Sequence, residues 1–172
     1  MAATFTLISS VTVGSGGTTN EVTFSSIPQT YTDLLVNISS KSSRTNNPGN
    51  WGLMKFNTSS ANFSNKNVFG DGTSAASSGI TANIGYLDNG NTANESNAFS
   101  NCQLYIPNYT GSNYKSYSID AVSENNATLA YTYLVAGLWS QTAAITSITF
   151  YPDTFTPYLQ YSTFYLYGIS NA

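Results

Sequence analysis

The stretch "YSTFYLYG" at residues 161–168 carries the pattern that decides the fold class. Successive side chains of a β-strand point to opposite faces of its sheet, so every second residue shares a face. One face of this stretch carries Tyr161, Thr163, Tyr165 and Tyr167, and the other carries Ser162, Phe164, Leu166 and Gly168. We expect a strand from about residue 161 to residue 169 with a tyrosine-rich face and an apolar face.

The same alternation recurs along most of the chain, separated by glycine, proline and asparagine turn signals. It predicts further strands at residues 5–13, 22–24, 34–38, 51–56, 103–106, 114–122, 130–139 and 145–150. The first two are expected to be joined by the glycine turn at 14–17, and the apolar run 34–38 to be buried on nearly both faces. No window keeps a helical period, and a brief helical turn at 139–144 is the most the pattern allows. The expected fold is an all-β, antiparallel β-sandwich of jelly-roll type with about eight to ten short strands and long polar loops.

Residues 57–101 carry the weakest alternation, because Asn, Ser, Gly and Ala dominate them. Short strands near 67–70 and 80–87 are expected in a mainly loop-like region. Turn signals lie at Gly70-Asp71-Gly72 and Asp88-Asn89-Gly90. Such oxygen-rich turns can hold calcium, but both sequences are common hairpin turns, and we favour the turn.

The length and composition indicate one uncharged domain built for association. A chain of 172 residues supports one sizeable core, so we expect residues 1–172 to form a single domain. Charged residues make up only 8% of the chain, with a net charge of −3, against roughly 25% in an ordinary soluble protein. Weak self-repulsion favours a component of an assembly, whose surface is covered by copies of the chain or by partners. The alternative is a monomer kept soluble by neutral polar groups.

Charge and hydropathy argue against two classes of partner. The basic residues are too few and too scattered for a phosphate-binding stripe: Lys41, Arg44, Lys55, Lys66 and Lys115. No apolar stretch approaches the length of a membrane span, and the first residues lack the pattern of a cleaved signal peptide. We therefore expect neither nucleic acid nor a membrane as a partner.

The residue types disfavour catalysis, a metal site and a cofactor. The chain has no histidine and one cysteine, Cys102, which is expected to be a small buried filler. A carboxylate pair could hydrolyse glycosides, but the eight acidic residues lie in no recognisable motif: Glu21, Asp33, Asp71, Asp88, Glu95, Asp120, Glu124 and Asp153. Asp33 is expected to bond local backbone amides before its strand. We therefore predict no catalytic, cofactor-binding or metal-binding residues and a protein that is not an enzyme.

The tyrosine face at 161–167 allows two interpretations. Aromatic rings can stack on sugar faces, so it could form a carbohydrate platform. With thirteen tyrosines spread through the chain, cross-strand packing or a subunit interface is the favoured interpretation.

Four segments, in order, resemble small virion-associated proteins of tailed bacteriophages, especially marine ones. They are "FTLISSVTVGSGGTTNEVTFSSIPQTYTDLLVNISSKS" (5–42), "YIPNYTGSNYKSYSIDAVSENNAT" (105–128), "AGLWSQTAAITSITFYP" (136–152) and "QYSTFYLYGIS" (160–170). The resemblance implies a structural role, location in the virion after synthesis in the host bacterial cytoplasm, and no catalytic residues. Residues 57–101 match least.

Two virion roles compete under this resemblance. A capsid decoration, or cement, protein would bind the major capsid protein or another virion protein in many copies and reinforce the shell. The resemblance then implies a homo-oligomer, with a trimer as the preferred form. A tail fibre or baseplate module would instead bind host-surface glycans. We favour decoration, because the chain carries no heptad coiled coil or collagen-like repeat. A depolymerase is a third and less favoured class.

Overall fold

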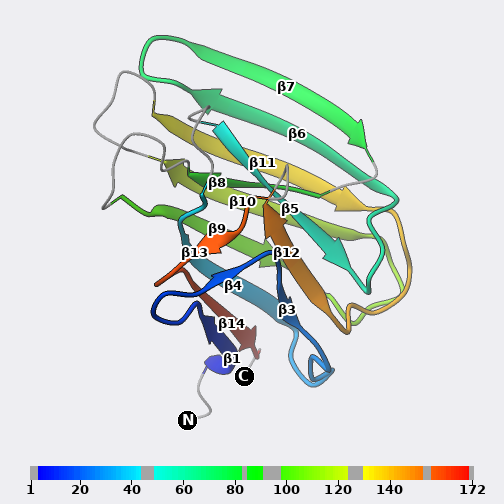
Figure 1. The fold of residues 1–172 in the computed structure, drawn as a ribbon. Coiled ribbons are helices and arrows are strands. Elements are labelled where there is room, and N and C mark those ends of the chain that lie inside the picture. The colour runs from blue at the N-terminus through cyan, green and yellow to red at the C-terminus, as the bar shows by residue number, and fades with distance from the viewer. Residues whose placement is uncertain are drawn as a thin grey trace.

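The chain forms two antiparallel β-sheets packed face to face and one short ribbon (Figure 1). This computed structural model describes residues 4–43, 49–82, 85–90, 98–123, 130–152 and 156–170. The strands are β1 (Phe5–Thr12), β2 (Thr18–Thr19), β3 (Val22–Phe24), β4 (Asp33–Ser40), β5 (Gly49–Phe56), β6 (Phe63–Gly70), β7 (Ala75–Ala82), β8 (Gly85–Gly90), β9 (Ser100–Ile106), β10 (Lys115–Ser123), β11 (Tyr131–Trp139), β12 (Ile148–Pro152), β13 (Tyr158–Leu159) and β14 (Thr163–Ile169). No helix occurs in the described ranges.

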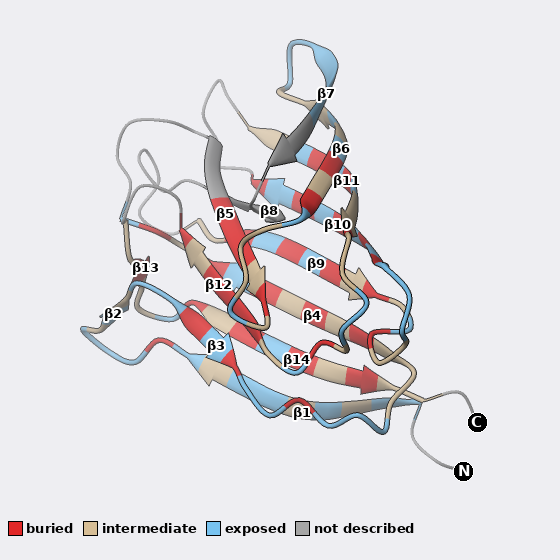
Figure 2. Cartoon of the chain, turned by 90° about the vertical axis from the view of Figure 1, so that its right-hand side faces the viewer, coloured by how far each residue is buried: buried red, intermediate tan, exposed pale blue. Residues whose placement is uncertain are grey.

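The larger sheet has eight strands in the order β1-β14-β4-β9-β10-β11-β6-β7, and the smaller has four in the order β3-β12-β5-β8. Strands β13 and β2 form the ribbon. The smaller sheet covers one face of the larger one, which we call the inner face (Figures 1 and 2). The predicted all-β, antiparallel sandwich is confirmed. The jelly-roll connectivity and the single domain over residues 1–172 stay predictions.

Alternation of side chains along each strand creates the core. In β10 every second residue from Lys115 to Ser123 is buried, and the residues between them are exposed. Figure 2 shows the same alternation of buried and more open residues along β4, β9 and β14. Each fully buried Leu, Ile or Phe side chain contributes roughly 1.5–3 kcal/mol relative to an exposed one, which makes the inner face the main source of stability.

Two aromatic clusters join the sheets through this core. Phe56 from the smaller sheet contacts three rings of the larger sheet, those of Phe63, Tyr117 and Trp139, at centroid distances of 5.3, 6.0 and 5.5 Å. At the other end of the sandwich, Phe150 of β12 stacks on Phe164 of β14 at 6.0 Å. Aromatic contacts of this kind add about 0.5–1.5 kcal/mol each beyond area burial.

Gly137 provides space for one of these rings. It lies directly opposite Tyr117 on β10 and Asn65 on β6. A Cβ atom at residue 137 would approach the Tyr117 ring to 2.0 Å. The ring therefore crosses β11 where a side chain is missing, and its hydroxyl donates a hydrogen bond to Oδ1 of Asn65.

The prediction for residues 57–101 was wrong in extent. Instead of a mainly loop-like region, its described residues form the hairpin of β6 and β7, then β8 and the start of β9. The sequence lacks the usual alternation of apolar and polar residues in these strands, because polar residues occupy positions that usually carry apolar side chains. The buried Asn65 accepts from Tyr117, and Oδ1 of Asn67 accepts from the Ser78 amide at 3.0 Å. Together with the two-residue strands β2 and β13, this raises the strand number of the described ranges above the predicted eight to ten.

Three further local predictions need correction. The segments 5–13 and 22–24 are strands, but they do not pair with each other: β1 pairs with β14, and β3 pairs with β12 in the other sheet. The run 34–38 is fully buried on one face only, because Leu35 and Asn37 face outward and are partly covered. Residues 140–147 form an extended loop without a helical turn.

Candidate binding surface

The outer face of the eight-stranded sheet, turned away from the smaller sheet, carries the candidate site. Strand register aligns its side chains in rows that run across the sheet. One row, which we call the central row, consists of Ser10, Tyr165, Asn37, Gln103, Asp120, Leu134, Val68 and Ser77. Neighbouring strands lie about 4.8 Å apart, so directly opposed side chains in a row are within contact distance.

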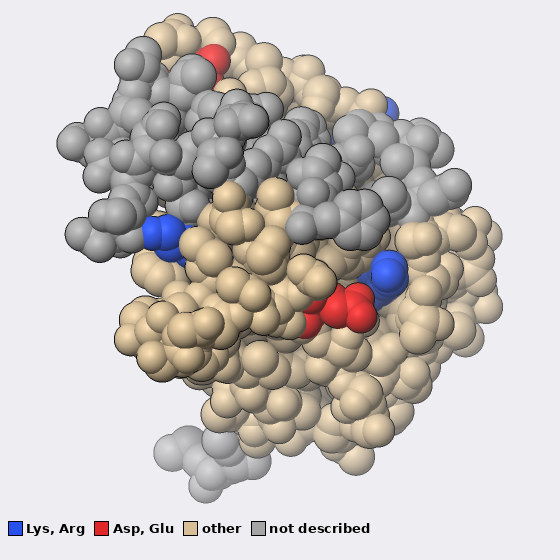
Figure 3. All heavy atoms as spheres, viewed as in Figure 1, with Lys and Arg blue, Asp and Glu red and all other residues tan. Residues whose placement is uncertain are grey.

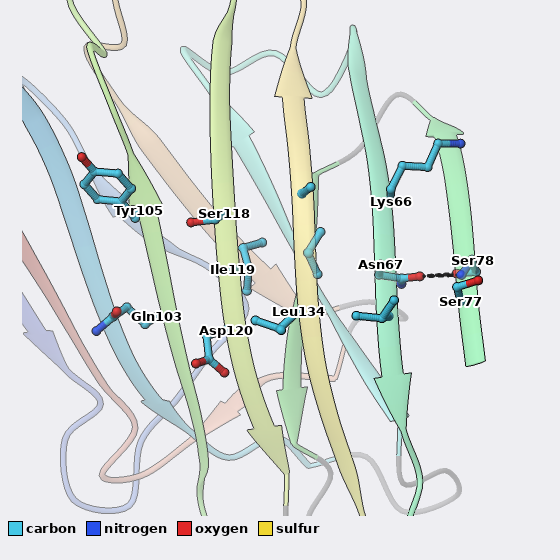
Figure 4. A pocket seen from close by; sticks show the side chains of 13 residues that line it. Lys66, Asn67, Ser77, Ser78, Gln103, Tyr105, Ser118, Ile119, Asp120 and Leu134 are labelled. Atoms are coloured by element: carbon cyan, nitrogen blue, oxygen red, sulfur yellow. Dashed lines mark hydrogen bonds between the residues drawn. The ribbon is translucent and has the colours of Figure 1, made fainter. Parts of the chain in front are cut away.

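A shallow depression, which we call the hollow, occupies the β9, β10, β11, β6 and β7 part of this face (Figure 4). Its volume is about 570 Å³. Leu134 and Val68 lie next to each other on its floor and are 58% and 54% exposed. Lys66 and Asp120 contribute the charged groups at its lining. A second depression of about 530 Å³ continues from the same two apolar residues over β7.

A second region of the outer face is polar, and we call it the polar groove. It lies over β14, β4 and β9 and has a volume of about 520 Å³. Its lining comprises Asn37, Ile38, Ser39, Phe99, Ser100, Asn101, Gln103, Thr163 and Tyr165. Nε2 of Gln103 donates to Oδ1 of Asn37 at 3.1 Å, which links β9 to β4 across the groove floor.

The predicted tyrosine face is present on β14 in part. Thr163, Tyr165 and Tyr167 point outward, while Ser162, Phe164, Leu166 and Gly168 are buried. Tyr161 lies in the turn before the strand, has a left-handed φ of 70°, and is 62% exposed. The tyrosine face is therefore shorter than predicted, and Tyr165 is the member that lines the polar groove.

Asp33 has a structural position, but its partners differ from those predicted. Its carboxylate accepts from the Tyr105 hydroxyl at 2.7 Å and from the Asn108 backbone N–H at 2.9 Å, both far away in sequence. The hydrogen bond to Asp33 raises the pKa of Tyr105 above its ordinary value, with burial as the second cause. Asp33 thus fixes the loop after β9 to the start of β4.

The two turns considered for calcium have different outcomes. Asp71 closes the β6–β7 hairpin: its carboxylate accepts from the Ser74 and Thr73 backbone N–H groups at 2.7 and 2.9 Å. These hydrogen bonds, led by that from Ser74, lower the Asp71 pKa to about 2. Asp88-Asn89-Gly90 is not a turn, because all three residues lie in β8 and pair with β5.

The acidic residues do not gather into a reactive or metal-binding cluster within the described ranges, where no group of three His, Cys, Asp or Glu lies close enough for a metal ion. Glu21 and Asp120 are exposed at separate places. Glu95, Glu124 and Asp153 lie outside the described residues, and the side-chain surroundings of Asp88 are not described. Cys102 is buried on β9, as predicted.

The basic residues are likewise dispersed, and Arg44 lies outside the described residues. Lys55 lies over the Tyr151 ring at 4.5 Å, and Lys41 over the Phe99 ring at 5.8 Å. Lys115 is buried, and its Nζ donates to the Asn113 and Thr142 carbonyls at 2.5 and 3.3 Å; burial lowers its pKa. Figure 3 shows the charged groups of the face turned to the viewer as a few small patches of either sign among uncharged side chains.

Comparison with protein-family models, with curated proteins and with solved structures finds no match to this chain. Within the described ranges, no helix is long and apolar enough to cross a bilayer.

Sequence reasoning missed both the hollow and the polar groove. Their residues come from strands that are far apart in the chain, and only the order of strands in the sheet brings them together. The available signal was the set of outward residues on each predicted strand, such as Leu134 and Gln103. Without the strand order, that set does not define a surface.

Proposed function

We propose that this chain is a non-enzymatic structural protein of a bacteriophage virion, a capsid decoration protein that attaches through the hollow of its outer face. The observation that carries the proposal is the exposed pair Leu134 and Val68 on an open, nearly uncharged sheet. Val122, 44% exposed on the neighbouring strand β10, extends the apolar area. Exposed apolar side chains that lie together on one face provide a candidate contact surface for a partner.

The physical basis of this role is repeated weak attachment. Burial of apolar surface contributes about 25 cal/mol per Å², so one small contact area gives modest affinity after the cost of association. Many copies on neighbouring capsid subunits, or a trimer with three hollows, multiply that affinity because each further contact is intramolecular. The proposed partner is the major capsid protein or another virion protein, and the trimer is the proposed oligomer.

The partner surface should be neutral and partly apolar. The charged groups at the hollow lining, Lys66 and Asp120, are of opposite sign and sit on either side of Leu134, on β6 and β10. Neither sign dominates, so long-range electrostatic steering contributes little. We expect attachment to depend weakly on salt concentration, in contrast to a contact between charged patches.

A substitution in the hollow tests the attachment. Leu134→Asp introduces a charge where the partner is expected to bury an apolar side chain, so we expect the purified variant to lose co-sedimentation with phage particles that lack this protein. Tyr161→Asp is the matched control, because Tyr161 is 62% exposed and lies outside the lining of the hollow. Both variants are checked for native folding by circular dichroism. Equal co-sedimentation of Leu134→Asp and wild type would overturn attachment through the hollow.

Copy number separates the shell from the tail. Quantitative mass spectrometry of purified virions should find this chain in numbers comparable to the major capsid protein if it decorates the shell. A ratio of a few copies per particle would place it in a tail fibre or baseplate instead. Its absence from purified virions would end the proposal of a structural role.

Catalysis is tested separately. Incubation of the purified protein with host polysaccharide should release no oligosaccharide. Sustained release that disappears in Asp120→Asn, the variant of the acidic residue in the hollow, would replace the structural role with a depolymerase.

A further inference from the structure

We propose that the polar groove is a binding site for a neutral saccharide, with the Tyr165 ring as the stacking platform and the Asn37 and Gln103 amides as the hydrogen-bonding groups. The groove is separate from the hollow in its chemistry, although Gln103 borders both. The inference does not depend on a virion role, because binding would be a property of the purified chain.

The aromatic platform is held rigidly from below. Tyr165 is 36% exposed on β14, while its chain neighbours Phe164 and Leu166 are fully buried on the inner face. Strand pairing on both sides, to β1 and to β4, fixes the backbone of β14 in the sheet. An amphipathic ring held in this way can cover an apolar sugar face while its hydroxyl stays in water, and little conformational freedom is lost on binding.

The amides lie beside this ring in the central row. Tyr165 is directly opposite Asn37, and Asn37 is directly opposite Gln103. Two strand spacings place the Gln103 position roughly 10 Å from the Tyr165 position across the sheet. A sugar ring seated against Tyr165 therefore has its hydroxyls directed toward a row of amides rather than toward bulk water.

The hydrogen bond between the amides sets their orientation. Because Gln103 donates to Oδ1 of Asn37, the Asn37 N–H groups and the Gln103 carbonyl oxygen remain available at the groove floor. This provides donors and an acceptor on adjacent strands. A sugar hydroxyl both donates and accepts, so two neighbouring hydroxyls match this pair better than an anion would, since an anion needs donors only.

Further neutral hydrogen-bonding groups lie in the next row along the strands. Thr163, Ser39 and Asn101 are directly opposed across β14, β4 and β9. All three line the groove. They extend the polar floor along the strand direction, which suits a saccharide longer than one ring.

The charges around the groove select against acidic sugars. The lining contains no charged residue among those described. Asp120 follows Gln103 in the central row and would repel a carboxylate or sulfate. Lys41 lies over the Phe99 ring, 5.8 Å from its centroid, so its charge already has an aromatic partner at that side of the groove. We infer a neutral hexose or N-acetylhexosamine glycan.

Saturation-transfer NMR with purified protein and single sugars tests the site. The probes are glucose, galactose, mannose and N-acetylglucosamine at millimolar concentration, with glucuronic acid as the acidic comparison. We expect at least one neutral sugar to receive transfer and to be competed by its own oligosaccharide, and glucuronic acid to receive less. Absence of transfer to every neutral sugar, or strongest transfer to glucuronic acid, would overturn the inference.

Matched tyrosine variants localise the binding. Tyr165→Ala should weaken binding about tenfold or more, because a central aromatic contact commonly contributes that much to an interface. Tyr165→Phe should retain binding, since the ring and not the hydroxyl forms the platform. Tyr161→Ala removes an equally prominent tyrosine outside the groove lining and should bind like wild type.

Amide variants provide the second measurement. Asn37→Ala and Gln103→Ala should each weaken sugar binding, while Ser118→Ala, in the hollow, should not. Unchanged affinity in Tyr165→Ala and Asn37→Ala would exclude the groove even if a sugar binds elsewhere. Tyr165 and Asn37 lie outside the lining of the hollow, so Tyr165→Ala and Asn37→Ala should continue to co-sediment with phage particles. Failure of the sugar site and failure of virion attachment therefore give different results.

Discussion

The two faces of strand β10 differ completely although they belong to the same nine residues. Tyr117, Ile119 and Ala121 point to the inner face and are almost inaccessible to solvent, whereas Ser118 and Asp120 point outward and are exposed. The inner side chains meet aromatic and aliphatic groups of the smaller sheet. Ser118 and Asp120 instead line the hollow of the outer face.

This contrast indicates that the inner face determines stability and the outer face determines binding. The inner face holds the two sheets together, so substitutions there should act on the free energy of unfolding. The outer face is an open surface of neutral polar and scattered apolar groups, so substitutions there should act on partners and leave folding nearly unchanged. Substitutions on the two faces therefore test that division.

Phe56→Ala should lower the free energy of unfolding by about 3–5 kcal/mol, because it opens a cavity among Phe63, Tyr117 and Trp139. Leu134→Ala on the outer face should change it by no more than about 0.5 kcal/mol. Urea unfolding followed by tryptophan fluorescence measures both. Similar losses for the two variants would break the division between the faces.

Gly137→Ala adds only one methyl group but should destabilise the protein by about 1–3 kcal/mol. The new Cβ would lie 2.0 Å from the Tyr117 ring, which must move and lose its hydrogen bond to Asn65. Gly14→Ala is the matched control, because a Cβ there meets nothing within 4 Å. If both variants show the same thermal unfolding midpoint, the Tyr117 ring does not cross β11 as described.

Asp71→Asn should have the smallest effect, and one that depends on pH. The Asp71 pKa is lowered to about 2 by hydrogen bonds from Ser74 and Thr73, so its ionised form contributes stability above pH ~4 that is lost as the pH falls through about 2. The free energy of unfolding should therefore be slightly higher for wild type than for the variant at about pH 6. The two values should be equal near or below the lowered pKa of Asp71. Urea midpoints at the two pH values measure this difference.

A constant difference between the two proteins at both pH values would show that the carboxylate charge does not support the β6–β7 turn. Asp120→Asn serves as the control, because its exposed carboxylate lies on the open outer face rather than in a turn.

Much of the fold follows from the sequence because alternation reports directly on strands with one buried face. The stretch 161–168 predicted which β14 side chains are buried, and β4, β9, β10 and β11 were predicted within a few residues of their bounds. The pattern failed for β6, where Asn65 and Asn67 point to the same side as Phe63 and Phe69 and form hydrogen bonds there. The composition of a strand also does not determine which strand it pairs with. The separation of β1 and β3 into different sheets was therefore not predictable.

The sequence predicted the chemical character of the candidate surface but not which residues form it. An 8% content of charged residues indicates a neutral exterior, and the tyrosine pattern placed Tyr165 outward. Which residues share a row depends on the strand order, and β9 lies beside β4 although more than sixty residues separate the paired positions Asn37 and Gln103. Local patterns carry no information about such distant pairing.

The pairing of β1 with β14 makes the protein suitable for circular permutation and labelling. Phe5 lies directly opposite Ile169, so the first and last strands leave the sheet at one corner (Figure 1). A short flexible linker could join these ends, and new ends could be cut at the exposed tip near Gly72, giving a circularly permuted chain. A fluorescent label attached next to Phe5 or Ile169 would stand at that same corner, away from the hollow over β9, β10, β11, β6 and β7.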